Sequence, residues 1–224
     1  MTAHLFKYEC ITNLHVGSGE VNYNVIDNEV EKDPANGFPM IHSSGVKGAM
    51  REHFADKMSK ADINRIFGTP PEQKKDVTSG SYNFLDAGFL ARPMRVKGNT
   101  MASIPVISAE SVRSFLRLTG AFGMQFGSLT DFIMDDNAFG QYEFLTNAPG
   151  DIRVEGEKTE KLPEEITAQL KALEPIIGST YAIARNLTEY DLPVVARNRL
   201  ENGESKQLWY EEIVPTAAYS TKSF

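Results

Sequence analysis

The chain has 224 residues, 41% of them apolar, and a formal net charge of −7, a composition typical of globular proteins and not of disordered or fibrous ones. The acidic balance argues against a protein that coats nucleic acid through bulk positive charge, although a local stripe of Lys and Arg could still bind phosphates. No segment approaches the roughly 20 apolar residues of a membrane-spanning helix, and the N-terminus has no basic stretch followed by an apolar one. We therefore expect a cytoplasmic protein with no membrane partner. Cys10 is the single cysteine, which excludes an internal disulfide and a zinc site built on cysteines.

At this length we expect one core with insertions. Residues 3–16 alternate between apolar and polar side chains, as a half-buried strand requires. The apolar face carries Phe6, Tyr8, Cys10, Leu14 and Val16, and the other face carries Lys7, Glu9, Asn13 and His15. His15 is therefore predicted at the strand end, on the face away from the core.

A long polar loop is predicted from Gly17 to Gly37, ending in the turn sequence Asp33-Pro-Ala-Asn-Gly37. Loops of this length are usually functional or disordered. Asp27, near its middle, could assist ribonuclease chemistry, in which a 2′-hydroxyl attacks the adjacent phosphate with help from a base, a metal or both. Three further carboxylates could share Mg²⁺ binding, namely Glu29, Glu31 and Asp33. On composition alone, a solvated acidic loop is the commoner explanation.

Two helices follow a short strand-like run at 38–41. Ser43 and Ser44 offer an N-cap to the first helix, with a buried stripe expected at Val46, Ala49, Met50, Phe54 and Met58. Lys47 and Arg51 lie four residues apart on the opposite face, where like charges repel unless an anion lies beside them. With the free N–H groups at the helix start they form a plausible phosphate cradle, although a solvated face with an ordinary cap fits equally well. A second helix over 60–67 should stop at Gly68, followed by a loop to residue 80.

The remaining pattern is mixed α and β. Strands are predicted over 82–85, 89–96, 104–107, 142–145 and 152–154, and helices after Ser108 and around Ile166, Leu170 and Leu173. Residues 122–137 fit no single pattern. Arg95 and Lys97, close to Arg92, add a second basic stretch, which is also common at exposed strand ends.

The segments 192–199 and 206–214 flank Asn202-Gly203, a dipeptide that favours a tight hairpin turn. Arg197, Arg199 and Lys206 beside Trp209 and Tyr210 suit contact with a nucleic acid backbone and stacking on bases. An ordinary hairpin with Trp209 in the core fits as well. Glu211 and Glu212 could be rim charges or acid–base partners.

Several segments together resemble one family. They are LHVGSG (14–19), VIDNEVEKDPANGFPMIHSSGVKGAMREHF (25–54), IFG (66–68), RPMRVKG (92–98) and LPVVARNRLENGESKQLWYEE (192–212). In this order and spacing they resemble the Cmr-type, or type III-B, CRISPR backbone subunits of the Cas-seven family, within the RAMP superfamily. The last segment favours the Cmr type over the related Csm type.

This resemblance implies an α+β fold: a single domain with a modified ferredoxin-like, RRM-type palm, inserted loops at 17–37 and 69–81, and a hairpin thumb over about 192–212. It also implies subunits that stack with further copies and other Cmr subunits along guide crRNA. Each would cut complementary single-stranded target RNA at regular intervals, with Mg²⁺ or Mn²⁺ as cofactor. The family's catalytic aspartate corresponds to Asp27, which would also hold the metal.

Further roles follow by the same resemblance. His15 and Glu211 or Glu212 are weaker catalytic candidates, and the guide-binding surface corresponds to Ser43, Ser44, Lys47 and Arg51. A glycine-rich C-terminal segment of the family is expected to be missing, and the acidic residues around Asp27 depart from the family pattern. Three alternatives stay open: a structural RNA-binding subunit of the same assembly that has lost cleavage, a Csm-type backbone subunit, and an acidic α+β protein unrelated to RNA.

Overall fold

The computed structural model describes residues 2–19, 25–70, 77–98 and 100–216. The chain folds into two compact units, one formed by residues 39–88 and the other by residues 1–38 with 89–224. Helices and strands both occur along the chain, so the mixed α and β class is confirmed. Among the described residues, no helix is both long and apolar enough to cross a membrane.

The smaller unit contains helices α1 (Ser43–Phe54) and α2 (Lys60–Phe67). The Ser59 hydroxyl accepts the Asp62 N–H and starts α2, and Gly68, at φ 82°, ends it as predicted. At α1 the predicted buried stripe is largely wrong, because only Val46 is buried and Ala49 is exposed. The strand predicted over 82–85 is also wrong: this segment has no strand, and the nearby Ala87 forms only an isolated bridge with Ile41.

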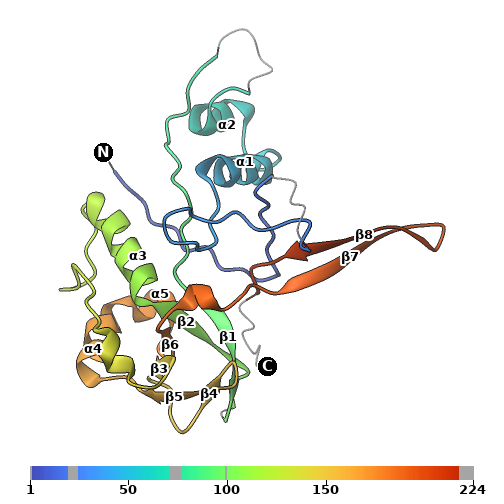
Figure 1. The fold of residues 1–224 in the computed structure, drawn as a ribbon. Coiled ribbons are helices and arrows are strands. Elements are labelled where there is room, and N and C mark those ends of the chain that lie inside the picture. The colour runs from blue at the N-terminus through green and yellow to red at the C-terminus, as the bar shows by residue number, and fades with distance from the viewer. Residues whose placement is uncertain (1, 20–24, 71–76, 99, 217–224) are drawn as a thin grey trace. The chain divides into compact units, whose positions relative to one another are not determined.

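The larger unit is built on a closed six-stranded sheet in the order β1-β2-β6-β3-β5-β4 (Figure 1). The strands are β1 (Arg92–Lys97), β2 (Ser103–Ser108), β3 (Phe144–Thr146), β4 (Arg153–Val154), β5 (Glu157–Lys161) and β6 (Ala182–Ala184). Strand β2 runs parallel to β6, and β3 runs parallel to β5, while the other neighbours are antiparallel. The prediction missed β5 and β6; β6 has only three residues, which is too short for a readable period.

Three helices accompany this sheet: α3 (Ala109–Ala121), α4 (Glu164–Leu170) and α5 (Glu174–Ile177). Helix α3 begins as predicted at Ser108, which forms a capping box with Ser111. Short 3₁₀ turns occur at Asp136–Phe139, Lys171–Leu173 and Leu187–Glu189.

Alternation along the strands gives the sheet two faces with separate cores. One cluster gathers Met94, Val96, Ile104, Val106, Phe144 and Val154. The other joins Ile107, Leu145 and Ile183 of the opposite face to side chains of α3 and α4. This second core also buries Leu129, Phe132 and Phe139, from and just beyond the segment that the sequence left unplaced.

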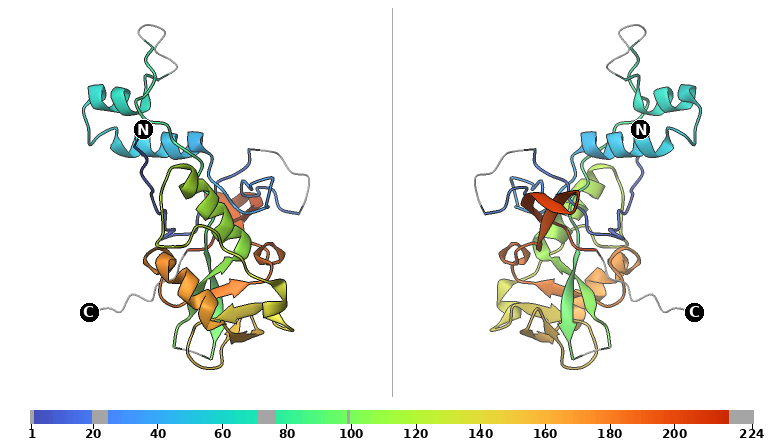
Figure 2. Two further views of the ribbon diagram at one scale, coloured as in Figure 1. Left: turned by 90° about the vertical axis from the view of Figure 1, so that its left-hand side faces the viewer. Right: turned by 90° about the vertical axis from the view of Figure 1, so that its right-hand side faces the viewer.

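Strands β7 (Val194–Glu201) and β8 (Glu204–Glu212) form the predicted hairpin. Asn202 and Gly203 have φ values of 53° and 84°, the positive values that this tight turn needs. The hairpin leaves the closed sheet as an arm (Figure 1), and Figure 2 views it nearly along its length.

The N-terminal strand prediction is wrong over most of its length. Residues 3–13 form no strand, and Phe6 and Tyr8 are 63% and 51% exposed. At its end, Leu14 forms a bridge with Val214 beyond the hairpin, and the Val16 carbonyl accepts the Glu31 N–H at 2.7 Å. Alternation shows which face of a strand suits burial, but it does not supply the neighbouring strand that buries it.

Candidate active site at the base of the hairpin

The acidic loop pairs with the free edge of β8 through an isolated bridge between Asn28 and Glu211. The Asn28 N–H donates to the Tyr210 carbonyl at 3.1 Å, and the Glu212 N–H donates to the Asn28 carbonyl at 2.9 Å. This parallel bridge joins segments that are more than 180 residues apart in sequence. It brings the loop that carries Asp27 to the base of the hairpin.

Asp27 lies beside this bridge and is exposed. Its Oδ2 accepts the Tyr210 N–H at 2.8 Å. The carboxylate is therefore fixed through one oxygen while the side chain still reaches solvent. Such a group can meet a ligand without first being reoriented.

Glu212 is buried, with 5% of its surface exposed. Its Oε2 accepts the Val30 N–H at 3.1 Å, and its Oε1 accepts from Lys32 Nζ at 3.0 Å. A buried carboxylate requires such partners, since an unpaired charge away from water is costly. Glu212 and Lys32 thus form an ion pair, here named the loop clamp, that holds the far side of the Asp27 loop against β8.

His15 is oriented by the same residue of β8. Its Nδ1 lies 2.7 Å from the Glu212 carbonyl oxygen, and because a carbonyl can only accept, Nδ1 must carry the proton. In the neutral ring, Nε2 is then the atom with a free lone pair. Gly17 leaves room beside it, because a Cβ built on Gly17 would lie 3.0 Å from His15 Nε2.

Glu211 points to the other face of β8 from Glu212, as alternation requires. Its Oε1 accepts from Trp209 Nε1 at 2.7 Å, and its Oε2 accepts from Arg197 Nε at 3.0 Å. The pKa of Glu211 is lowered, chiefly by the Trp209 hydrogen bond and further by Arg197 and by the charge of His15. Glu211 therefore stays ionised.

Four residues proposed from the sequence therefore meet here: His15, Asp27, Glu211 and Glu212. The sequence did not distinguish Glu211 from Glu212, but the two side chains lie in different environments. Sequence reasoning missed Lys32, Gly17 and the Trp209–Glu211 hydrogen bond. In the sequence, Gly17 stands two residues after His15 within HVGSG. Why a glycine suits this position becomes clear only from the place of the His15 ring in the structure.

The basic candidates of the larger unit are partly occupied. Arg95 binds the Glu155 carboxylate through Nε and Nη2, at 2.9 and 2.7 Å. Arg197 pairs with Glu211, and Arg199 with Glu201 at 3.1 Å. Lys97 is exposed and forms no ion pair with any described residue.

In the smaller unit, the predicted serine cap of α1 is wrong, because the N-cap residue is His42 and no side chain caps the helix. Ser43 and Arg51 have other partners within the unit. The Ser43 N–H donates to the Asp86 carboxylate at 2.6 Å. Arg51 donates to the Gly68 carbonyl and to Asn64 Oδ1, at 2.9 and 3.3 Å, and so ties α1 to the end of α2. Ser44 is exposed, and Lys47 is half-buried without an ion pair inside the described ranges.

Asp27 offers an exposed carboxylate that a divalent cation could meet. Across the described residues, no group of three or more His, Cys, Asp or Glu side chains is placed to hold a metal ion. Asp33 uses both carboxylate oxygens within its own turn, on Ala35 and Asn36. Asp27 has one oxygen on the Tyr210 N–H and is exposed, and one carboxylate completed by substrate phosphates and waters is a common way for proteins to bind Mg²⁺.

The family model of the RAMP superfamily matches residues 7–223. The chain belongs to the RAMP superfamily.

The relatives narrow this assignment. The chain is 30% identical over 237 residues to the CRISPR system Cmr endoribonuclease Cmr4 of Pyrococcus furiosus, covering 96% of this chain and 79% of the relative. Its fold resembles a chain of the type III-B Cmr-beta complex bound to cognate target RNA, with a TM-score of 0.67, 22% identity and coverage of 93% and 78% of the two chains. It also resembles oligomeric Cmr4 from Pyrococcus furiosus, with a TM-score of 0.57, 20% identity and coverage of 95% and 81%. Within the superfamily the chain is thus a Cmr-type, type III-B backbone subunit, as its sequence motifs predicted.

Proposed function

We propose that this subunit binds RNA within a multisubunit type III-B effector and cleaves single-stranded target RNA paired to a guide crRNA. Its partners would be further copies of itself and other Cmr subunits. The relative named above is an endoribonuclease by name, and a similar fold occurs in a complex with target RNA. The observation that carries the proposal is the meeting of His15, Asp27 and Glu211 at the base of an arm-like hairpin. In this proposal the closed sheet corresponds to the modified ferredoxin-like palm and β7–β8 to the thumb.

His15 would act as the general base. Its Nδ1–H is held by the Glu212 carbonyl, so Nε2 can accept the proton of a ribose 2′-hydroxyl. The 2′-oxygen then attacks the adjacent phosphorus, the bond to the 5′-oxygen breaks, and the leaving oxygen takes a proton from solvent. The ionised Glu211 stabilises the imidazolium that forms, in the manner of a carboxylate that orients and balances a catalytic histidine.

Asp27 would act on the phosphate side of the reaction. Its carboxylate is held by the Tyr210 N–H and would hold a divalent metal, Mg²⁺ or Mn²⁺. When bound, such a metal supplies positive charge that stabilises the extra negative charge of the transition state.

A structural role for the same residue is the alternative. The Asp27–Tyr210 hydrogen bond helps to join the loop to β8, so Asp27 could serve the assembly without taking part in chemistry. A subunit of this kind would bind guide and target RNA and leave both intact.

Asp27→Asn separates these roles, because the amide oxygen can still accept the Tyr210 N–H while the negative charge is lost. The test compares wild type, Asp27→Asn and Asp27→Ala in the reconstituted complex with guide, complementary RNA and Mg²⁺ or Mn²⁺. Loss of regularly spaced products by a factor of about 100 or more in both variants, with guide binding retained, supports catalysis. Cleavage retained by Asp27→Asn and lost only in Asp27→Ala supports the structural role, and unchanged cleavage in both places the chemistry elsewhere.

A further inference from the structure

Three basic side chains lie directly opposite one another across the strands β1, β4 and β5. Lys97 pairs in register with Arg153, and Arg153 pairs with Lys158. Directly opposed residues of antiparallel strands point to the same face of the sheet. All three are exposed, and they are here named the basic row.

The positive charges of the basic row are poorly balanced by ion pairs with other described residues. Like charges placed opposite each other in a sheet are destabilising. Within the described part of the chain, Lys97 and Lys158 make no ion pair, and Arg153 donates only to the Gly156 carbonyl, at 2.9 Å. The neighbouring Arg95, by contrast, is neutralised by Glu155 at 2.7 Å. A row of repelling cations without an ion pair among the described residues is the arrangement expected of a surface that meets an external anion.

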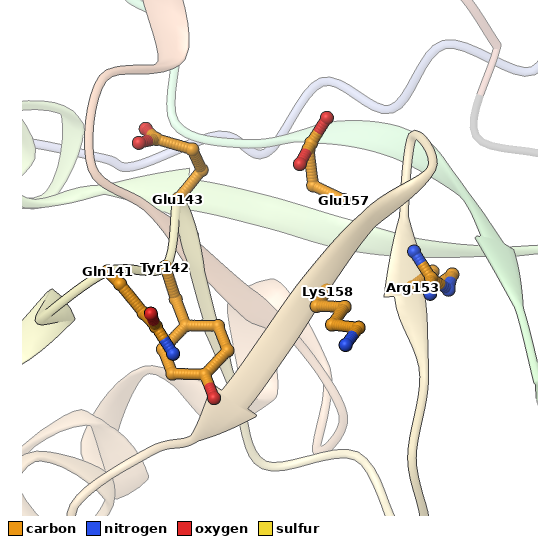
Figure 3. Close-up of a pocket in the computed structure, with 6 residues that line it drawn as sticks. All are labelled: Gln141, Tyr142, Glu143, Arg153, Glu157 and Lys158. Atoms are coloured by element: carbon orange, nitrogen blue, oxygen red, sulfur yellow. The ribbon is translucent and has the colours of Figure 1, made fainter.

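A pocket of about 390 Å³ adjoins this row. Its lining combines Arg153 and Lys158 with Gln141, Tyr142, Glu143 and Glu157. Figure 3 shows the Gln141 amide beside the Tyr142 ring, the Lys158 side chain between this ring and Arg153, and the two carboxylates above them. One of these carboxylates, Glu143, lies 3.8 Å from Arg185 Nε and is thereby partly balanced.

This composition suits a nucleotide. The volume falls in the range of small-molecule sites, roughly 300–1,000 Å³. Tyr142 offers a ring for stacking a base, and Gln141 offers an amide for a base edge, which are the groups that bind unpaired nucleotides. Lys and Arg beside them can then contact the phosphates on either side.

We propose that the basic row and the Tyr142 pocket form a second RNA contact, binding the phosphates and one unpaired base of a single-stranded segment. This rests on the proposed RNA-binding function and extends it to a surface distinct from the hairpin site. Arg92, at the other end of β1, donates to the Tyr190 and Asp191 carbonyls that lead into the hairpin. The basic row therefore lies about 16 Å along β1 from that junction, at roughly 3.3 Å per residue.

The test uses the purified full chain and a labelled single-stranded RNA without complementarity to any guide. It compares wild type with a triple variant, Lys97→Gln/Arg153→Gln/Lys158→Gln, by fluorescence anisotropy over a range of salt concentrations. The matched control is Lys7→Gln/Arg117→Gln/Lys171→Gln, which removes the same charge from exposed positions elsewhere. Circular dichroism melting checks that all three proteins fold.

Binding to single strands depends on salt with a slope of about −0.7 per phosphate contact, so losing three contacts should flatten the slope by about 2. Between about 1 M and 0.1 M salt, the affinity of the wild type should therefore rise up to about 100-fold more than that of the triple variant. The control should keep the wild-type slope. Equal slopes in wild type and the triple variant would overturn the proposal, as would equal losses in both triple variants. A triple variant that binds RNA normally but no longer joins the other subunits would assign the row to an acidic protein surface instead, and would overturn it too.

Failure here is distinguishable from failure of the proposed function. Cleavage that persists in Asp27→Asn and Asp27→Ala removes the catalytic assignment and leaves the salt slope of the basic row as a separate result. A flattened slope with inactive wild-type complex supports the second RNA contact and the structural role of the subunit together.

Discussion

Removing Lys32 from the loop clamp should destabilise the hairpin base measurably. Lys32→Met leaves the Glu212 carboxylate buried, with 5% exposure and, among the described residues, only the Val30 N–H as partner. Removing one partner of a fully buried ion pair costs about 3–5 kcal/mol. Because the Lys32 side chain is 39% exposed, the pair is partly screened, and we expect about 2 kcal/mol.

Glu212→Gln should cost less, about 1 kcal/mol, because its amide oxygen can still accept the Val30 N–H. In the double variant no buried charge is left without its partner. The two losses should therefore fall short of adding, with a coupling energy of about 1 kcal/mol.

The fluorescence of Trp209 can be used to measure these changes in the free energy of unfolding. This residue is the single tryptophan and lies on β8 three residues before Glu212, so urea unfolding followed by its fluorescence reports on this region. Lys171→Met, at an exposed lysine, is the matched control and should change stability by less than about 0.5 kcal/mol.

The clamp should also matter for cleavage. Lys32→Met should lower RNA cleavage by the assembled complex about 10- to 100-fold, because a small displacement of a catalytic group has effects of this size. Additive energies in the double-mutant cycle, within about 0.3–0.5 kcal/mol, would refute the clamp. Full cleavage in a measurably destabilised Lys32→Met would refute its positioning role.

Two further outcomes are expected. Gly17→Ala places a Cβ 3.0 Å from His15 Nε2 and should reduce cleavage at least tenfold with a stability change under about 1 kcal/mol; equal cleavage by the variant complex would show that this space is not used. Burial, aided by the charge of Glu174, raises the pKa of Tyr181 to about 12, so the folded state favours the neutral phenol. The neutral phenol therefore contributes stability that is complete below about pH 10 and is lost as the pH rises towards 12. The Tyr181 hydroxyl also lacks a hydrogen-bond partner among the described residues, so Tyr181→Phe should unfold less readily over this range and gain about 1 kcal/mol at neutral pH. Unfolding curves of the two proteins that stay parallel from pH 8 to 12 would contradict this.

The hairpin and several helix ends could be predicted from the sequence because their causes are local. Asn202-Gly203 sets a turn by its own backbone preferences, and Ser108 satisfies N–H groups within one helical turn. The N-terminal segment has an equally regular pattern, but the strand predicted from it was wrong. Its apolar face needed a partner strand, and the sheet closed through β1 and β4 without it.

The candidate site, too, could be predicted from the sequence only in part. Motif order and residue chemistry pointed to Asp27 and His15, and offered Glu211 and Glu212 without separating them. Alternation already required these two neighbours to face opposite ways. Which one would be buried depended on the loop that packs against β8.

By itself, the sequence determined the family, the hairpin and the chemical types available for the reaction, because these depend on residue identity and short-range spacing. Only the tertiary structure decided that Lys32 pairs with Glu212, that the Glu212 carbonyl sets the tautomer of His15, and that Lys97, Arg153 and Lys158 line up across three strands. The first two join residues about 180 or more positions apart, and the third depends on strand register. No periodicity in the sequence encodes such contacts, since they arise from the free energy of packing the whole chain.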